Sequence, residues 1–202
     1  MKLIHLLLLV ELLAVTEVLV AMDWPDDYSP ELVKKAEEGD AFAQWEIGRC
    51  YSNGKGVERN EKEAFKWYMK SAEQGYAFAQ YNVALKYWFG NGVGKDEREA
   101  VVWFTKSAEQ GEGQAQCFLG DCYFYGIGGV SKDETEAVEW YTKGAETTHF
   151  RDVQYKIGEC YFYGIGVTKD HEEAVKWYTK AAEQGDAKAK GAIEAIKKME
   201  SK

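Results

Sequence analysis

The chain has 202 residues, of which 46% are hydrophobic, and it carries a formal net charge of -9. This length and composition fit one elongated domain without an internal linker or a low-complexity tract. Because the basic residues are dispersed and fewer than the acidic ones, the charge argues against a nucleic-acid partner.

The first predicted element is a hydrophobic leader, residues 1–22, followed by a polar linker at 23–29. The leader has the layout of a cleaved secretory signal, which predicts a secreted, periplasmic or lumenal protein. Glu11 and Glu17 are unusual in such a segment, and each would cost on the order of 2 to 3 kcal/mol at the centre of a membrane. A stable membrane span is therefore the less favoured interpretation. A third alternative is a start at Met22 and a cytoplasmic protein.

A unit of 36 to 38 residues recurs four times after the linker. Its marker is a tryptophan followed by a second aromatic residue, at Trp67-Tyr68, Trp103-Phe104, Trp140-Tyr141 and Trp177-Tyr178. The four copies cover residues 40–75, 76–111, 112–149 and 150–185. The whole repeat region is residues 30–200, because residues 30–39 read as a lone second helix and residues 186–200 as a cap made of a lone first helix.

Each copy predicts two helices separated by a glycine turn. In copy one, a helix over residues 41–52 precedes Gly54-x-Gly56, and a second helix runs from Glu61 to about Gln74. Every second helix begins with Asn or Asp followed three residues later by Glu, which predicts a reciprocal capping box. These pairs are Asn60/Glu63, Asp96/Glu99, Asp133/Glu136 and Asp170/Glu173.

The second helices carry small residues on the same face as the tryptophan, as Ala64, Trp67 and Ser71 show in copy one. One isolated hairpin could not bury this stripe, so neighbouring copies are expected to stack into a continuous core. We expect the indoles to be buried between copies.

These residues resemble the Sel-1-like repeat, whose pattern is A-x-x-x-[LIF]-G-x-x-Y-x-x-G-x-G-V followed by D-x-x-x-A-x-x-[WF]-[YF]-x-K-[AS]-A-E-x-G. Copy one matches it at Ala43, Gly48, Tyr51, Gly54, Gly56, Val57, Ala64, Trp67, Tyr68, Lys70, Ala72 and Gly75. Copy two has Ala84 at the position of the first-helix glycine, and copy three ends in Glu-Thr-Thr-His, residues 146–149, instead of Glu-Gln-Gly. The resemblance implies an all-α, right-handed α/α solenoid of about four helix-turn-helix repeats with helical caps.

The cysteines are interpreted as small buried apolar residues. Cys50, Cys122 and Cys160 occupy the same phase of three first helices, and Cys117 is the fourth. Residues of one phase in stacked units usually lie too far apart for the ~5.5 Å Cα separation of a disulfide. The cysteine-rich relatives of the family staple their units with cysteine pairs, whereas this chain has residues such as Ala72 at those positions. The disulfide state stays open at this point.

The motifs for catalysis and for metal binding are weak. Ser52-Asn53-Gly54-Lys55 matches the Ser-x-x-Lys of penicillin-recognising enzymes, but it lies on the predicted glycine turn instead of one helical turn. His149 and His171 belong to different copies and form no zinc motif. We therefore predict no catalytic residue, no cofactor and no metal.

A stripe with spacings of 3, 4 and 3 follows each first helix beyond the core positions. In related solenoids the first helices line the concave surface, so the resemblance implies a groove that is aromatic toward its N-terminal half and more acidic toward its C-terminal half. The candidate groove residues are Phe42, Trp45, Phe78, Tyr81, Leu85, Trp88, Asp121, Phe124, Tyr155, Glu159 and Phe162. The alternative is that some of these rings, above all Trp45, Tyr81 and Tyr155, pack between copies.

The expected function is that of a non-enzymatic, monomeric scaffold or adaptor that binds a peptide or protein segment in the groove. A segment with apolar residues and some Lys or Arg would suit this surface. Two alternatives stay open. One is a cell-wall or β-lactam-related hydrolase of the cysteine-rich branch of the family, and the other is a purely structural, self-associating spacer.

Overall fold

The structure is a computed structural model, which describes residues 28–200. The predicted leader and most of the polar linker lie outside these residues. None of the helices within residues 28–200 has the length and hydrophobicity that a membrane span requires.

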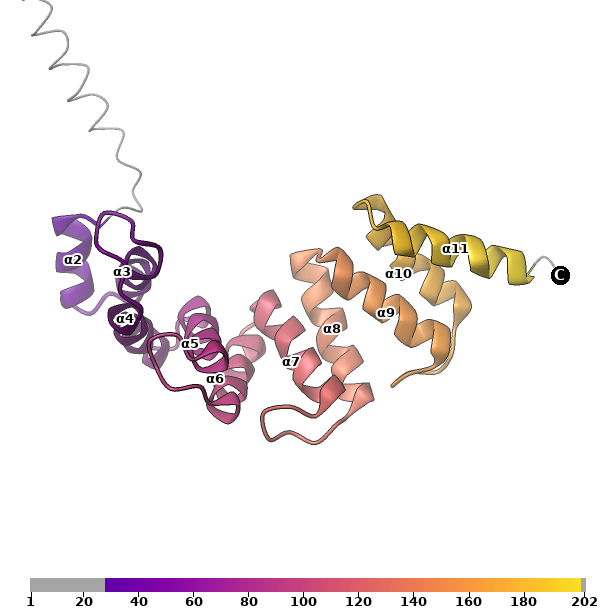
Figure 1. Cartoon of the computed structure of the whole chain (residues 1–202), viewed down its shortest axis with the longest axis horizontal. Coiled ribbons are helices and arrows are strands. Elements are labelled where there is room, and N and C mark those ends of the chain that lie inside the picture. The colour runs from indigo at the N-terminus through magenta and orange to yellow at the C-terminus, as the bar shows by residue number, and fades with distance from the viewer. Residues whose placement is uncertain (1–27, 201–202) are drawn as a thin grey trace, which may run out of the picture.

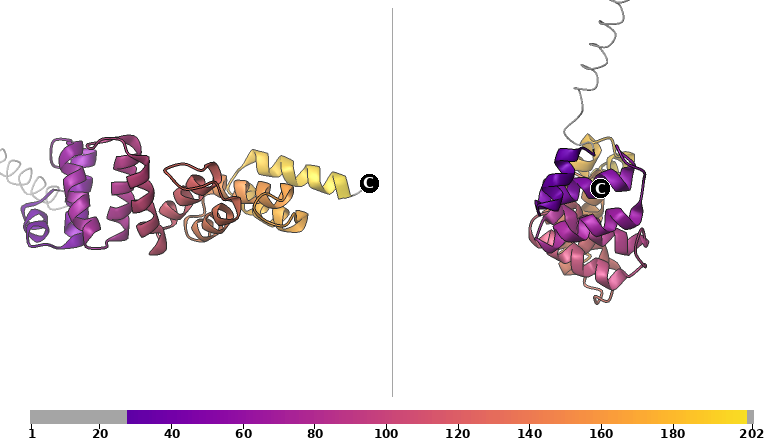
Figure 2. Two further views of the ribbon diagram at one scale, coloured as in Figure 1. Left: turned by 90° about the horizontal axis from the view of Figure 1, so that it is seen from below. Right: turned by 90° about the vertical axis from the view of Figure 1, so that its left-hand side faces the viewer.

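Ten helices follow one another in the described part of the chain, which contains no strand. They are α2 (Pro30–Glu37), α3 (Ala41–Asn53), α4 (Glu61–Glu73), α5 (Ala77–Phe89), α6 (Glu97–Glu109), α7 (Gly113–Tyr125), α8 (Glu134–Thr148), α9 (Arg151–Tyr163), α10 (His171–Glu183) and α11 (Ala187–Glu200). Each pair of a first and a second helix packs against the next pair, so the helices form one arc (Figure 1). The end-on and side views show an elongated rod of stacked hairpins (Figure 2). The fold is an all-α solenoid of helix-turn-helix repeats with α2 and α11 at its ends.

The glycine turns join neighbouring copies. Gly54 ends α3 in the left-handed conformation, with φ of 70°. The second glycine of each later turn lies against the preceding copy, since a Cβ on Gly92 would overlap the carbonyl of Glu61. Gly128 and Gly166 lie in the same way on the carbonyls of Glu97 and Glu134. Each turn is therefore seated on the start of the preceding second helix.

Only one of the two hydrogen bonds of the predicted capping box is present at the start of each second helix. The Asn60 side chain accepts from the amides of Lys62 and Glu63, at 3.1 and 3.2 Å. The reciprocal half of the box is wrong, because the Asn60 amide donates to the carbonyl of Tyr51, at 2.9 Å. The amides of the other three cap residues, Asp96, Asp133 and Asp170, donate likewise to Tyr87, Tyr123 and Tyr161. The turn already provides a backbone acceptor for the cap amide, so the glutamate is left for other partners, such as Lys66 for Glu63.

The residue after each tryptophan, and not the tryptophan itself, lies deepest in the core. Tyr68, Phe104, Tyr141 and Tyr178 are all fully buried. A Cβ on Gly48 would lie 2.5 Å from the Tyr68 ring, and Gly120 and Gly158 meet their tyrosines in the same way. Copy two has the larger Ala84 at this position and the smaller Phe104 opposite, and both are buried in one cluster. The exchange in copy two keeps the combined volume of the pair similar.

The tryptophans lie at the edge of the core. Trp103 and Trp177 are buried as expected, whereas Trp67 and Trp140 are only partly buried, so the prediction is wrong for these two. In every copy the lysine three residues later places its ammonium 3.7 to 4.2 Å from the indole centroid. The lysine covers the outer ring face by a cation–π contact, which allows the indole to remain at the surface.

Glutamines link successive copies in the first part of the solenoid. The first-helix residues Gln44, Gln80 and Gln116 each donate to a carbonyl at the end of the preceding second helix, at 3.0 to 3.2 Å. A second glutamine at the end of the same copy donates to the first, in the pairs Gln74/Gln44, Gln110/Gln80 and Gln184/Gln154. Copy three has Thr147 in place of the second glutamine, and this copy therefore lacks the link.

Candidate partner-binding surface

Three cavities open along the first helices, beside residues of the predicted stripe. The N-terminal cavity, about 300 Å³, lies where α3, α5 and the start of α7 meet. The junction cavity, about 510 Å³, lies between α7 and the start of α9. The C-terminal cavity, about 380 Å³, lies between α9 and the start of α11. The stripe residues that line these cavities include Trp45, Phe78, Tyr81, Asp121 and Tyr155.

The N-terminal cavity is bordered by a cluster of four aromatic rings. Trp45 lies 5.5 to 5.8 Å from Phe42, Tyr76 and Phe78, measured between ring centroids. Its indole nitrogen donates to the amide oxygen of Asn82, at 2.7 Å, which fixes the ring across two copies. Phe42 and Phe78 are half exposed, at 52% and 50%. The cluster therefore presents two ring faces to solvent on a rigid support.

A buried lysine that the sequence analysis did not identify lies behind Ser52, which is one of the residues lining this cavity. Lys86 is only 8% exposed and donates to Ser52, at 2.9 Å, and to Glu61. Burial alone would raise the pKa of Glu61, but hydrogen bonds from Lys86 and Arg59 outweigh it and lower that pKa. As an ion-paired ammonium group, Lys86 donates to Ser52 and cannot remove its proton, so this pair is not an activated nucleophile.

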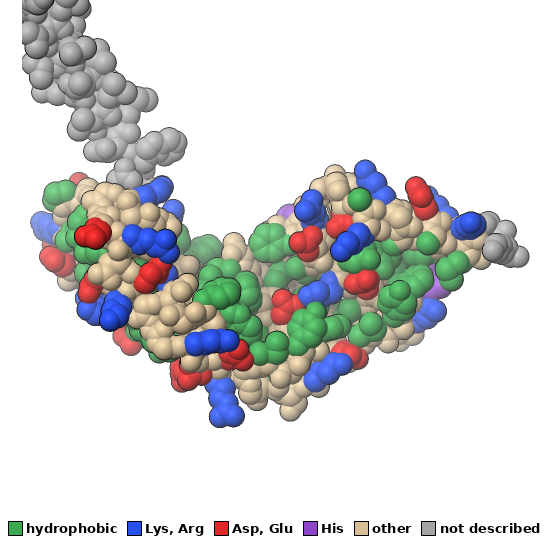
Figure 3. Space-filling model, viewed as in Figure 1, with side chains coloured by type: hydrophobic (Ala, Val, Ile, Leu, Met, Phe, Trp, Pro, Cys, Tyr) green, Lys and Arg blue, Asp and Glu red, His purple; other side chains and the backbone are tan. Residues whose placement is uncertain are grey.

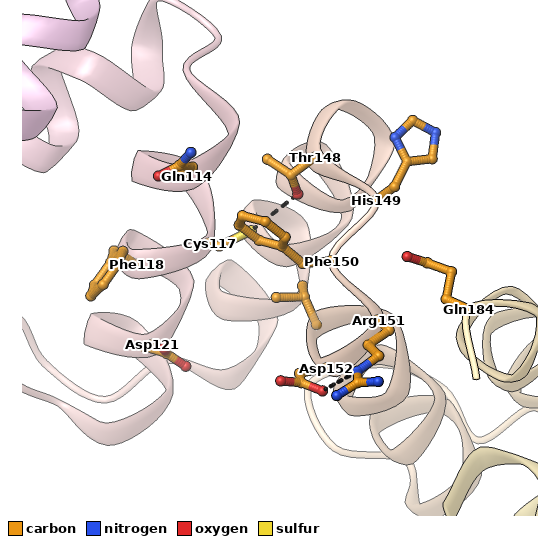
Figure 4. A pocket seen from close by; sticks show the side chains of 11 residues that line it. Gln114, Cys117, Phe118, Asp121, Thr148, His149, Phe150, Arg151, Asp152 and Gln184 are labelled. Carbon is orange, nitrogen blue, oxygen red and sulfur yellow. Dashed lines mark hydrogen bonds and ion pairs between the residues drawn. The ribbon is translucent and has the colours of Figure 1, made fainter. Parts of the chain in front are cut away.

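The junction cavity combines an apolar wall with a polar rim. Figure 4 shows Gln114, Phe118 and Asp121 on α7 across the opening from Phe150 and Asp152, which lie at the start of α9. Burial raises the pKa of Cys117, in the cavity wall, to about 11. This thiol therefore stays protonated near neutral pH and serves as an apolar wall residue.

Asp121 ties three helices together beside this cavity. One of its oxygens accepts from Tyr141, at 2.6 Å, and from Lys156, at 2.5 Å. Burial raises the pKa of Tyr141, and the carboxylate of Asp121 raises it further, so Tyr141 remains a donor. The Asp121 side chain is still 43% exposed, which leaves part of the carboxylate open to a partner.

The remaining predicted residues lie at the border between core and surface. Trp88 packs on Phe104 and Phe124 on Tyr141, with centroids 6.1 and 6.2 Å apart. The other half-buried residues of the prediction are Tyr81, Leu85, Tyr155, Glu159 and Phe162. Tyr81 and Leu85 pack against the central core, Tyr155 on Tyr178, and Phe162 on His171.

The most exposed rings at the ends of the first helices are at positions that the predicted stripe does not include. Phe89, Tyr125 and Tyr163 are 60%, 58% and 64% exposed. Each immediately follows a half-buried ring of the predicted stripe, which are Trp88, Phe124 and Phe162. The sequence signal available for finding them was an aromatic residue directly before the first turn glycine in three of the four copies.

The described residues contain no group of three or more His, Cys, Asp or Glu side chains placed to hold a metal ion. His149 follows the last residue of α8, and His171 is the first residue of α10. Residue His171 instead stacks on Phe162, with centroids 4.9 Å apart.

Comparisons with known proteins agree with the repeat geometry. A family model described as Sel1 repeat matches residues 41–76, 77–112, 113–147 and 151–186. The crystal structure of a protective antigen from uropathogenic Escherichia coli, with an SLR fold, has a TM-score of 0.73 and 42% identity and covers 79% of this chain. A Sel1 repeat protein from Oxalobacter formigenes has a TM-score of 0.71 and 41% identity and covers 77% of this chain. This chain spans 34% and 63% of the lengths of those two proteins. A search of curated proteins found no match.

Proposed function

Since the chain belongs to the Sel1 repeat family, we propose that it is a non-enzymatic scaffold or adaptor that holds a segment of another protein along its first helices. The observation that carries the proposal is where the exposed hydrophobic side chains lie. Six of the eight exposed large hydrophobic side chains of the described residues are aromatic and lie on the first helices or at their starts, at Phe42, Phe78, Phe89, Tyr125, Phe150 and Tyr163. Figure 3 shows hydrophobic side chains gathered over the middle of the arc. Aromatic anchors of this kind dominate the energy of protein interfaces.

The chemistry of the surface favours a partner segment with two kinds of side chain. Large apolar side chains fit beside the Phe42 and Phe78 rings and in the junction cavity. Lys or Arg side chains are complementary to the exposed carboxylates of Asp121 and Asp152. We propose that the protein acts as a monomer, so that this surface is open to the partner.

The test uses a pair of half-exposed rings that contact only partly buried rings, Trp45 and Tyr76, among the aromatic residues. Peptides selected from a random library for binding to the purified protein should lose affinity about 1,000-fold for Phe42→Ala with Phe78→Ala, since two hot-spot rings are each worth on the order of 2 kcal/mol. Val102→Ala, which removes an exposed side chain from the second helix α6, is the control and should bind as the unmodified protein does. Equal affinity in both variants, measured by calorimetry with unchanged helical circular dichroism, would reject the aromatic surface as the binding site.

Trp88→Ala with Phe124→Ala is a less suitable test, because both rings pack on core aromatics. Loss of binding in that double variant would not separate a lost contact from a damaged core. The alternative of a hydrolase lacks support from Ser52, because its hydroxyl accepts a hydrogen bond from the ion-paired Lys86. Sizing chromatography addresses the alternative of a self-associating spacer, since the adaptor is expected to elute as a monomer.

We also propose export, on the basis of the apolar leader over residues 1–22. The N-terminal residue of the protein purified from its source tests this directly. A start at or near Met22 or Asp23, together with recovery from a secreted, periplasmic or lumenal fraction, is the expected result. Recovery of the intact leader from the cytoplasm would contradict it.

A further inference from the structure

Copy three packs more closely within itself than the other copies do. Gly113 on α7 and Gly144 on α8 face each other, because a Cβ on Gly144 would lie 2.6 Å from the Cys117 sulfur and 2.9 Å from the Gly113 carbonyl. In copies one and two the Gly144 position is Ser71 or Ser107, whose hydroxyl donates to the start of the first helix. The two glycines bring α7 and α8 together, and these two helices share the most extensive contact of all consecutive pairs.

The last turn of α8 also packs within copy three, against α7, and not against copy four. Helix α8 has 15 residues, whereas α4, α6 and α10 have 13. A Cβ on Gly113 would overlap Thr147 and Thr148, which shows that the added turn lies against the start of α7. The chain then enters α9 through His149, the one non-glycine residue of the described part with positive φ, at 55°. A histidine in this conformation is strained relative to the glycine that the other copies have there.

The junction between copies three and four is open as a result. Helices α8 and α9 share fewer contacts than any other consecutive pair. The junction cavity and another of about 420 Å³, lined by Glu146, His149 and Gln184, flank the His149 linker on two sides. At this junction Gln154 is the counterpart of Gln44, Gln80 and Gln116, but among the described residues its side chain donates to no carbonyl of the preceding second helix.

The other end of the same junction is held. Gly166 lies against the carbonyl of Glu134, as the equivalent turn glycine does at earlier junctions. Lys156 on α9 reaches across to Asp121 on α7 and lies 3.3 Å from the Tyr141 hydroxyl. One end of the interface is therefore fixed by a seated turn and an ion pair, whereas the other end has cavities and a missing hydrogen bond.

We propose that this junction is a hinge, about which copy four and α11 rotate as one body against copies one to three. The pivot is the Gly166–Glu134 contact, and rotation opens or narrows the junction cavity. Loose packing and a missing hydrogen bond across the junction lower the free-energy difference between alternative arrangements, whereas the tight core of copy three resists deformation within the copy. The inference does not depend on the proposed partner.

Four equivalent, exposed positions on the second helices provide a matched measurement. They are Lys66, Val102, Glu139 and Lys176. Spin labels on introduced cysteines at 102 and 176 span the proposed hinge, and labels at 66 and 139 span two junctions outside it. The native cysteines are buried, so they react slowly with the label. The distance distribution measured by pulsed electron resonance should be broader for the 102–176 pair than for the 66–139 pair. Equal widths in the unmodified protein would overturn the proposal.

A junction variant locates the motion. Thr147→Gln, Thr148→Gly and deletion of His149, together with Gly113→Ala and Gly144→Ser, give copy three the ending and the spacing of copy two. The introduced glutamine should donate to Gln116, and the 102–176 distribution should narrow to the width of the 66–139 pair. A distribution that stays broad in a folded variant would place the motion elsewhere and refute the hinge. If the variant does not fold, the comparison of the two label pairs in the unmodified protein still decides the matter.

Discussion

The junction between copies one and two and the junction between copies three and four have the same backbone arrangement, but the side chains that fill them differ. The first contains a four-ring cluster, a buried Lys86 and a hydrogen bond from Gln80 to the carbonyl of Ala72. The second contains two cavities and a half-exposed ion pair, and it lacks the equivalent hydrogen bond from Gln154. Repetition of the hairpin therefore sets the fold, whereas residues that differ between copies set how firmly neighbours are held.

Removal of a core ring should have the largest effect, and the two halves should respond differently. Phe104→Ala removes a ring of the cluster that runs from α4 to α7, and Tyr178→Ala removes one from the separate cluster of α10 and α11. Each should cost about 3 to 5 kcal/mol. In urea, Phe104→Ala should lower the main transition, whereas Tyr178→Ala should add an early transition for copy four alone. Coincident single transitions in both variants, followed by circular dichroism and fluorescence, would contradict two separable halves.

The two junction lysines should differ in their contribution to stability. Lys86→Met leaves Glu61 without its buried partner and should lower the free energy of unfolding by about 3 kcal/mol at neutral pH. Lys156→Met removes a partner that is 28% exposed, and should cost about 1 kcal/mol or less. Urea unfolding of both variants makes the comparison. Equal losses would mean that the two ion pairs are equivalent despite their different burial.

At acid pH, the contribution of the Lys86–Glu61 ion pair to the free energy of unfolding should be lost. Because the pKa of Glu61 is lowered from its ordinary value of 4.5, its stabilising effect is present above pH 4.5 and is lost as the pH falls through the folded pKa. The difference in unfolding free energy between the unmodified protein and Lys86→Met should therefore shrink below pH 4.5. A difference that stays constant down to pH 3 would show that Lys86 acts by packing instead of charge.

The smallest effect is expected at Glu112, which caps α7 between the two regions. Burial raises the pKa of Glu112, and amide hydrogen bonds offset this only in part. Its contribution to stability is thus full below the unfolded pKa and is lost as the pH rises through the folded pKa. Glu112→Gln should stabilise the protein by about 0.5 kcal/mol at pH 7 and by less at pH 4. Asp40→Asn, at the exposed cap of α3, is the matched cap substitution with which the Glu112 variant is compared.

The repeat plan could be predicted from the sequence because it depends on local chemistry. Glycine predicts a turn position with positive φ, and Asn or Asp predicts a helix N-cap, from the residue type alone. The structure confirms both predictions. The reciprocal capping bond was wrong because the acceptor that replaces it, the carbonyl of Tyr51, becomes available only after the turn folds back. Likewise, an equal pattern in four copies does not show that Tyr68 lies deeper than Trp67.

The candidate surface could be predicted only in outline. The spacing of 3, 4 and 3 identified the correct helices but did not separate rings that pack on the core, such as Trp88, from the exposed Phe89 one residue later. The two positions differ by about 100° around a helix, so which one faces solvent depends on how the neighbouring copy is set. Lys86 was missed for the same reason, since its partner Glu61 belongs to another copy.

The seating of each glycine turn on the preceding second helix has a consequence for how such chains change in length. Gly92, Gly128 and Gly166 each pack on the first carbonyl of the second helix of the preceding unit, and the next unit packs in the same way on the second helix that follows. Duplication of one whole unit therefore reproduces both the glycine turn and the carbonyl on which the next turn packs. The array can grow in this way without a new kind of interface. Gain or loss of a partial unit would leave a glycine loop with no carbonyl to dock on, so length variation is expected in whole multiples of the hairpin.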